Sequence, residues 1–266
     1  MKLLCPICGE ILDRIEKQYR CGNGHSFDLA RQGYVNLLPV QQKRSLNPGD
    51  TREQVLGRRA FLETGCYEPI SNALNETAKE LGATGPILDV GCGEGYYSAR
   101  LAEALGAELT GLDISKEAVR CAAAKYKGPQ WLCGTAAHLP VESHSAGVVT
   151  SLFALIMAEE FKRVLRPDGY FFQVLAAEDH LLGLKSIIYP ELKFKEKNTV
   201  PEVPGFELVK SVPIRFTFTV EGEQVQNLLG MTPHVFRITK EGAARLAATE
   251  KLTDTASAVL NVYKPL

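Results

Sequence analysis

Four residues near the start of the sequence have the types and the spacing of a metal site. Cys5 and Cys8 are separated by two residues, Cys21 follows after twelve more, and His25 after another three. Thiolates and imidazoles are the ligands of structural zinc sites, and the short first gap lets one tight turn aim two sulfurs at one ion. All four positions of the ion would be filled by the protein, so we predict a structural and not a catalytic zinc. Redox chemistry is less favoured, because the CxxC pair does not follow a strand.

A glycine-rich turn in the middle of the sequence has the pattern of a nucleotide-type binding site. A short apolar run, Ile87–Val90, predicts a strand, and Tyr96–Leu105 predicts a helix. Between them lie Gly91, Gly93 and Gly95. A strand, a glycine turn and a helix in this order place a ligand at the carboxyl edge of a parallel sheet, where glycines let the backbone approach it.

Acidic residues around this turn favour one of two ligands. Asp113 lies 20 positions after Gly93, at the end of the next predicted strand, where it can accept hydrogen bonds from ribose hydroxyls. The turn alone fits both NAD and S-adenosylmethionine. The GxGxG spacing and the negative charge of Glu94 disfavour a pyrophosphate. S-adenosylmethionine carries positive charge and no phosphate, so Glu94, together with Asp89 inside the first strand, favours S-adenosylmethionine.

The elements that must position these residues alternate between strand and helix from residue 86 onward. The predicted strands are 87–90, 108–114, 130–133, 147–152 and 170–175, and the predicted helices are 96–105, 116–126 and 159–165, with Ser115 as a helix N-cap. This alternation predicts an α/β fold with a parallel, doubly wound sheet. Two later apolar runs, 207–220 and 256–263, are suited to an antiparallel pair, with a helix in the segment 222–249 between them.

The sequence divides into three parts. Residues 1–40 form the predicted zinc module, residues 41–85 a loop and linker helices, and residues 86–266 the α/β domain. Residues 41–51 are polar and contain Asn-Pro-Gly, which is typical of a loop, and 52–65 has helical spacing of apolar residues.

Composition and charge narrow the function further. The chain has 266 residues, 45% of them hydrophobic and 23% charged, which excludes collagen-like and disordered proteins. Its net charge is −1, but residues 1–60 carry ten basic and six acidic side chains. The N-terminal part is therefore basic and the remainder acidic, a division that favours an anionic partner for the N-terminal part.

The sequence also suggests a cellular compartment. No stretch approaches the roughly 20 apolar residues of a membrane helix, and the start has no long apolar leader. Seven cysteines, an odd number, do not suit a disulfide framework. We therefore expect no membrane segment and a reducing, cytoplasmic location.

Several motifs together resemble a known family. DVGCGEGYYSARL and RVLRPDGYFF resemble class I S-adenosylmethionine-dependent methyltransferases. The zinc pattern with HSFDLARQGYVNLLPV, KRSLNPGDT, FLETGCYEPI, LKSIIY and MTP (231–233) makes the whole chain similar to the bacterial large-subunit rRNA guanine-N1-methyltransferases. The resemblance implies a Rossmann-like, seven-stranded methyltransferase sheet with a small N-terminal zinc-binding domain. It also implies methyl transfer to N1 of a guanine in the helix-35 loop of domain II of 23S rRNA, and a homodimer.

The resemblance assigns roles to individual residues. Asp113 would hold the ribose, Gly91, Gly93 and Glu94 the methionine part, and Thr135 with Ala136 the adenine. Tyr67 and His180 match family positions that reach the cofactor, although on their own they fit a core aromatic and a helix-start residue better. The predicted cofactor-binding set is Tyr67, Asp89, Gly91, Gly93, Glu94, Gly95, Tyr96, Asp113, Ile114, Thr135, Ala136 and His180. Thr135 stands where many methyltransferases have Asp, a stronger acceptor for the adenine amine.

The predicted RNA contacts are basic and aromatic. The phosphate candidates are Lys43, Arg44, Arg52, Arg58 and Arg59. The family has roughly Tyr-Ala-Pro-Cys after the fourth strand, whereas this chain has Phe153-Ala154-Leu155-Ile156. Phe153 keeps a stacking ring there, and no catalytic base is predicted. Two alternatives stay open, a small-molecule methyltransferase of the same fold and a non-catalytic RNA-binding protein, as does the choice between two neighbouring guanines.

Overall fold

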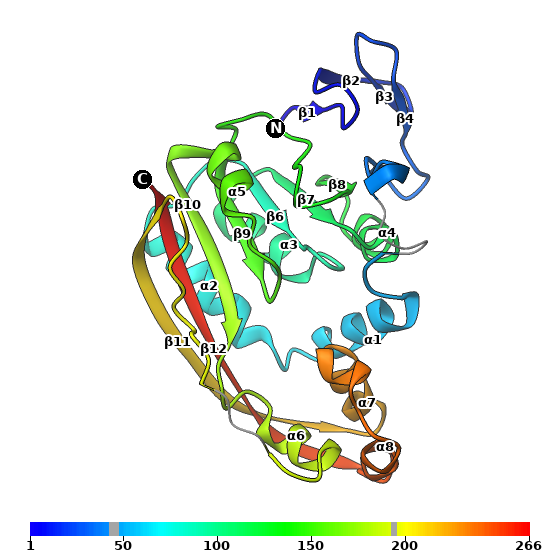
Figure 1. Cartoon of the computed structure of the whole chain (residues 1–266), viewed down its shortest axis with the longest axis vertical. Helices are drawn as coiled ribbons and strands as arrows, with labels where there is room; N and C mark the ends of the chain where they lie inside the picture. Colours follow the sequence, from blue (N-terminus) through cyan, green and yellow to red (C-terminus); the bar gives the residue numbers. More distant parts are fainter. Residues whose placement is uncertain (43–47, 193–195) are drawn as a thin grey trace.

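A small antiparallel sheet forms the N-terminal end of the chain. The computed structural model describes residues 1–42, 48–192 and 196–266. The strands of the small sheet lie in chain order, β1 (Leu3–Leu4), β2 (Ile11–Ile15), β3 (Gln18–Arg20) and β4 (Ser26–Asp28). Figure 1 shows this sheet at one end of the molecule, beside the larger sheet. Leu3, Cys5 and Cys21 are buried in the same apolar cluster as Leu88 of the larger sheet, so the two sheets share a core.

The larger sheet has eight strands in the order β11-β12-β10-β9-β6-β7-β8-β5. Their bounds are β5 (Tyr34–Asn36), β6 (Ile87–Val90), β7 (Leu109–Asp113), β8 (Gln130–Cys133), β9 (Ala146–Leu152), β10 (Leu165–Ala176), β11 (Phe206–Glu221) and β12 (Lys251–Pro265). The strands from β5 to β10 pair in parallel, and β12 pairs antiparallel with both β10 and β11. The predicted α/β fold, with its parallel strands and its antiparallel pair, is confirmed.

One strand of the larger sheet was not predicted. The sequence indicates seven strands, and the eighth is β5, which comes from the segment assigned to the zinc module. Tyr34 and Val35 are buried against the sheet, and the backbone of β5 pairs in parallel with β8. The pairing satisfies backbone groups that β8 would otherwise expose as an edge strand.

The helices of the described residues lie around the larger sheet. They are α1 (Arg52–Leu62), α2 (Glu68–Glu80), α3 (Tyr96–Leu105), α4 (Lys116–Lys125), α5 (Ala158–Val164), α6 (Leu182–Ile188), α7 (Glu223–Gly230) and α8 (Lys240–Ala247), with 3₁₀ turns η1 (Val40–Gln42) and η2 (Pro233–Phe236). The Ser115 hydroxyl accepts a hydrogen bond from the Ala118 N–H, which confirms the predicted N-cap. The helix predicted over 52–65 ends at Leu62, before Gly65 at φ 80°. Of the predicted loop 41–51, residues 43–47 lie outside the described residues.

The last two strands carry a second group of helices. β11 and β12 are paired along almost their full length, from Phe206 opposite Pro265 to Glu221 opposite Lys251. In Figure 1 their far ends carry α6, α7 and α8, and α7 packs against α1. Of the helices in the described part of the chain, none has the length and apolar character needed to cross a bilayer.

Candidate functional site

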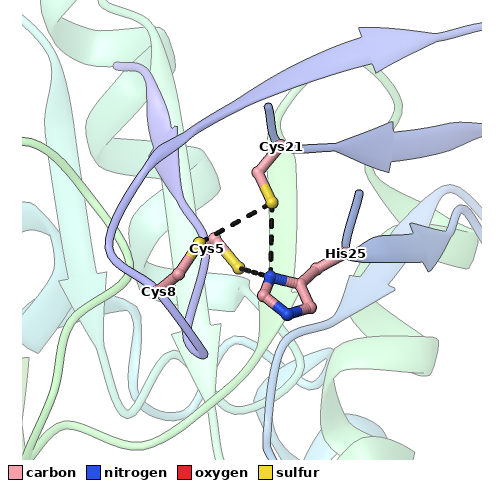
Figure 2. A group of neighbouring side chains, drawn as sticks. All are labelled: Cys5, Cys8, Cys21 and His25. Carbon is pink, nitrogen blue, oxygen red and sulfur yellow. Dashed lines mark hydrogen bonds between the residues drawn. The ribbon is translucent and has the colours of Figure 1, made fainter. Parts of the chain in front are cut away.

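The four predicted zinc ligands come together at the tip of the small sheet (Figure 2). The Sγ atoms of Cys8 and Cys21 are 3.7 Å apart, and Nδ1 of His25 lies 3.5 Å from Sγ of Cys5 and 3.4 Å from Sγ of Cys21. A tetrahedral zinc with bonds of about 2.3 Å to sulfur and about 2.0 Å to nitrogen separates its ligands by about 3.8 Å (S–S) and about 3.5 Å (S–N). The donors and their separations therefore fit one structural zinc ion.

A cavity of about 2020 Å³ opens at the carboxyl ends of β6, β7, β9 and β10. The members of the predicted cofactor-binding set that line it are Tyr67, Asp89, Gly91, Gly93, Glu94, Asp113, Ile114, Thr135, Ala136 and His180. Gly95 and Tyr96 are described residues outside this lining. Gly95 caps α3 at φ 82°, and Tyr96 begins that helix with a buried ring. They support the turn and do not face the cavity.

The glycine turn brings the backbone close to its neighbours. Gly91 has φ 84°, and a Cβ atom there would lie 2.7 Å from the Cβ of Ala154. The N–H of Gly93 donates to Oδ2 of Asp113 at 2.9 Å, and the N–H of Ser115 donates to Oδ1 at 2.8 Å. Asp113 thus holds the turn in place and keeps lone pairs for hydroxyl donors in the cavity.

Glu94 is the most unusual acid of this site. It is 4% exposed, and its Oε2 has no hydrogen-bond partner among the described residues. The nearest cation is Arg58, whose Nη1 lies 3.9 Å from Oε2, too far for a hydrogen bond. Burial raises the pKa of Glu94 to about 7, although the charge of Arg58 acts in the opposite direction. The arrangement leaves a buried carboxyl oxygen available to a cationic donor.

The Arg58 side chain lines the cavity and is mostly buried. Its guanidinium pairs with Asp50 and approaches Glu94, and it lines the cavity. The main-chain oxygen of Asp50 accepts a hydrogen bond of 2.8 Å from the Ser115 hydroxyl. The chain around residue 50 and helix α1 therefore form a wall of the cavity beside Asp113 and Ser115.

The other RNA candidates have different surroundings. Arg59, next to Arg58, points away and pairs with Glu63 at 2.9 Å. Arg52 is exposed at the start of α1. Lys43 and Arg44 lie outside the described residues. Successive helix positions point about 100° apart, and for this reason Arg58 and Arg59 do not share a surface.

Asp89 is a buried acid with an internal partner. Its Oδ1 accepts a hydrogen bond of 2.6 Å from the Thr150 hydroxyl, which comes from the neighbouring strand β9. Burial raises the pKa of Asp89 to about 6. The side chain is therefore partly satisfied by the sheet itself, while the residue still lines the cavity.

Three rings meet on the opposite wall. The Tyr67 hydroxyl lies 3.3 Å from Nε2 of His180, and Nδ1 of His180 lies 3.0 Å from the carbonyl oxygen of Ser257. Burial lowers the pKa of His180 to about 4, so its imidazole is neutral at pH 7. The Phe153 ring, 6.3 Å from His180 between centroids, is 42% exposed. Phe153 also has φ 55°, a conformation that costs free energy for a residue with a side chain.

The outer part of the cavity contains residues that the sequence analysis did not assign. Lys185 belongs to α6, and Tyr189 follows it directly. Lys197 lies in the segment after α6, His234 in η2, and Arg237 directly after η2. The Tyr189 hydroxyl and Nδ1 of His234 are 2.8 Å apart. The motifs LKSIIY and MTP contain or adjoin several of these residues. They are the sequence feature that could have identified this part of the cavity.

Comparisons with known proteins agree with this geometry. A family model described as "RlmA, N-terminal" matches residues 3–46, and one described as "Methyltransferase domain" matches residues 88–173. The chain is 32% identical to the "23S rRNA (guanine(748)-N(1))-methyltransferase" of Streptomyces fradiae, covering 99% of this chain and 97% of that protein. It is also 32% identical, with the same coverages, to a Micromonospora griseorubida protein named "Putative 23S rRNA (guanine-N(1)-)-methyltransferase".

The fold has relatives among solved structures. A structure titled "Putative Type II Methyltransferase from Anaeromyxobacter dehalogenans" matches with a TM-score of 0.54 and 18% identity, covering 72% of this chain and 95% of that one. This likeness supports the methyltransferase fold alone. The near full-length sequence identity and the N-terminal zinc-module match go further, and the chain therefore belongs to the 23S rRNA (guanine-N1)-methyltransferase family.

Proposed function

We propose that this protein transfers a methyl group from S-adenosylmethionine to N1 of a guanine in 23S rRNA. The observation that carries the proposal is the similarity over 99% of the chain to relatives with that activity in their names. The two supporting features are a zinc cluster suited to a structural ion and a cavity with Asp113 and the glycine turn at its base.

We propose the following roles for the cavity residues toward the cofactor. Asp113 accepts hydrogen bonds from the ribose hydroxyls, as an acid at the end of a second strand commonly does. Ile114 and the backbone at Thr135 and Ala136 flank the adenine, because they line the cavity next to Asp113. Glu94 accepts from the ammonium of the methionine part, since its Oε2 is buried and lacks a hydrogen-bond partner among the described residues.

The chain contributes alignment and exclusion of water to the reaction. The cofactor supplies an electrophilic methyl group on a positively charged sulfur. Phe153 presents an exposed ring at the carboxyl end of β9, where a guanine turned out of the RNA would stack. His180 packs beside Phe153, Tyr67 packs against His180, and the neutral His180 adds no charge there. We assign the N1 proton to no side chain.

The basic N-terminal part is the proposed RNA-binding surface. It comprises the zinc module with Arg52, and Lys43 and Arg44 stay predicted contacts from the sequence. Arg58 is left out of this surface, because its side chain pairs with acids in the cavity. The family resemblance also favours a homodimer and a cytoplasmic location, where ribosomal RNA is available, and light scattering of the purified protein tests the first.

The test is methyl transfer to RNA. Purified protein, tritiated S-adenosylmethionine and large-subunit rRNA should give labelled RNA, and primer extension should stop at one guanine, because N1 methylation blocks Watson–Crick pairing. Asp113→Asn should abolish the label, whereas Asp168→Asn, which changes an exposed acid, should keep it. Absence of label and of a stop with the unmodified protein would contradict the proposed function.

A further inference from the structure

The cavity is larger than its cofactor requires. Pockets for small molecules typically have volumes of about 300–1,000 Å³, whereas this cavity has about 2020 Å³. The predicted cofactor-binding residues occupy its inner part, at the ends of β6 and β7. Its outer part, which we call the outer chamber, is lined by Lys185, Tyr189, Lys197, His234 and Arg237.

Two ammonium groups are held near one point of the outer chamber. Nζ of Lys185 donates to the carbonyl oxygen of Glu178 at 3.3 Å, and Nζ of Lys197 donates to the carbonyl oxygen of Ala177 at 3.4 Å. These carbonyls belong to adjacent residues of the loop after β10. The charge of Lys197, together with burial, lowers the pKa of Lys185, which is consistent with their closeness.

In the described part of the chain, no carboxylate forms an ion pair with these cations. Among the ion pairs of residues 1–42, 48–192 and 196–266, Lys185, Lys197 and Arg237 take part in none. Exposed lysines such as Lys240 share this, but Lys185 and Lys197 line a cavity. Glu178 and Glu191 also line the cavity, and the charges of Asp254 and Glu178 partly oppose the lowering of the pKa of Lys185 without forming an ion pair with it. Two ammonium groups beside each other repel, and an anion between them would remove that repulsion.

Aromatic rings accompany the cations. Tyr189 and His234 form an edge-to-face pair with centroids 5.5 Å apart, and Phe236 is 75% exposed on the cavity wall. Cations that follow a backbone, together with rings on which bases stack, are the combination used for single-stranded nucleic acid. A small apolar or zwitterionic substrate would not require either feature.

The outer chamber also connects to the proposed position of the target base. The loop that carries Ala177 and Glu178 ends at His180, whose ring lies beside Phe153. The N–H of His180 donates to the same Ala177 oxygen that Lys197 contacts. A group bound by the two lysines would therefore lie next to whatever stacks on Phe153.

We propose that Lys185 and Lys197 bind the phosphodiester beside the target guanosine when that guanosine is turned out of the RNA stack. The proposal rests on the proposed function and names the group that the outer chamber recognises. Turning a base out of its stack costs a few kcal/mol, and contacts to the adjacent phosphate offset that cost only in the open conformation. The ligand is the RNA backbone and not the base edge.

The test measures binding separately from chemistry. A helix-35 RNA hairpin is titrated with the protein and S-adenosylhomocysteine at several salt concentrations. For Lys185→Gln/Lys197→Gln, the affinity should fall and the slope of log K against log salt should become shallower by about 0.7 for each phosphate that the protein no longer neutralises. Lys185→Arg/Lys197→Arg should keep the slope, and Lys240→Gln, an exposed lysine outside the cavity, should match the unmodified protein.

The outcomes separate this inference from the proposed function. In the double glutamine variant, cofactor affinity should be unchanged and the melting temperature should not fall, which excludes misfolding as the cause. An unchanged salt slope for hairpin binding by the double glutamine variant would overturn the phosphate contact. If the unmodified protein binds the hairpin with the expected slopes but methylates no guanine, the proposed function fails by itself.

Discussion

We predict that Glu94 makes the affinity for the cofactor dependent on pH. The side chain is 4% exposed, and burial raises its pKa to about 7 in the free protein. An ammonium placed against its Oε2 favours the ionised carboxylate, so the bound pKa falls below the free one. Below pH 7 the free protein is mostly protonated at Glu94, and binding must expel that proton. The affinity for S-adenosylmethionine should therefore fall as the pH falls.

The size of the effect follows from the pKa. With a free pKa of about 7, Glu94 is ionised in about nine tenths of the molecules at pH 8 and in about one tenth at pH 6. If only the ionised form binds well, the affinity should fall about tenfold between pH 8 and pH 6, or about 1.4 kcal/mol. Lowering the pH further would reduce the affinity only as far as the pKa that Glu94 has in the complex. Below that pKa the carboxyl is protonated in both the free and the bound protein, and the affinity stops falling.

The assay is calorimetric titration at pH 6, 7 and 8. Glu94→Gln provides the reference, because the amine of the free cofactor titrates identically in both measurements. The ratio of the two affinities should change about tenfold, and buffers with different ionisation enthalpies should reveal proton release near pH 6. A ratio that stays constant from pH 6 to pH 8 would refute the placement of the ammonium beside Glu94.

Three further predictions concern the metal, the turn and the target base. Cys21→Ser should lower the zinc content below one per chain and the melting temperature by several degrees. Cys66→Ser, which lies outside the cluster, should leave the zinc content and the melting temperature unchanged. Equal zinc content in the two variants would contradict the ligand set. Gly91→Ala should destabilise the protein more than Gly82→Ala, because both have positive φ but only the first meets an atom, at 2.7 Å; chemical denaturation with equal losses would speak against the close approach. Phe153→Ala should lower kcat/KM for RNA roughly 5- to 150-fold, the equivalent of about 1–3 kcal/mol of base stacking, while the cofactor affinity stays constant. Unchanged methylation would exclude the Phe153 ring as the stacking surface for the target base.

The sequence predicts those parts of the fold that are determined by residues close together in the chain. The strands before and after the glycine turn and the Ser115 cap are coded by short runs of residues, and they lie where predicted. β5 was missed because its three residues, Tyr34–Asn36, carry no periodic signal, and its strand state depends on pairing with β8, about one hundred residues later.

The site divides in the same way. Asp113 was placed by its distance from Gly93 in the sequence, and the structure joins them by a hydrogen bond. Arg58 was grouped with Arg59 because charge alone does not tell which helix face meets Glu94. Lys185 and Lys197 were missed because their surroundings arise only when the loop after β10 folds back on them.

The β5–β8 pairing connects the zinc module to the wall of the cavity. β8 ends at Cys133, directly before the residues that flank the proposed adenine position, and the N–H of Leu37 donates to the Cys133 oxygen at 2.8 Å. The segment leaving the zinc module is thus part of the same hydrogen-bonded framework as the cavity floor. For an RNA bound by the zinc module, the distance from the bound segment to the methyl donor would therefore be fixed. Lengthening the stem of a substrate by a base pair should therefore abolish methylation and not move it to another guanine.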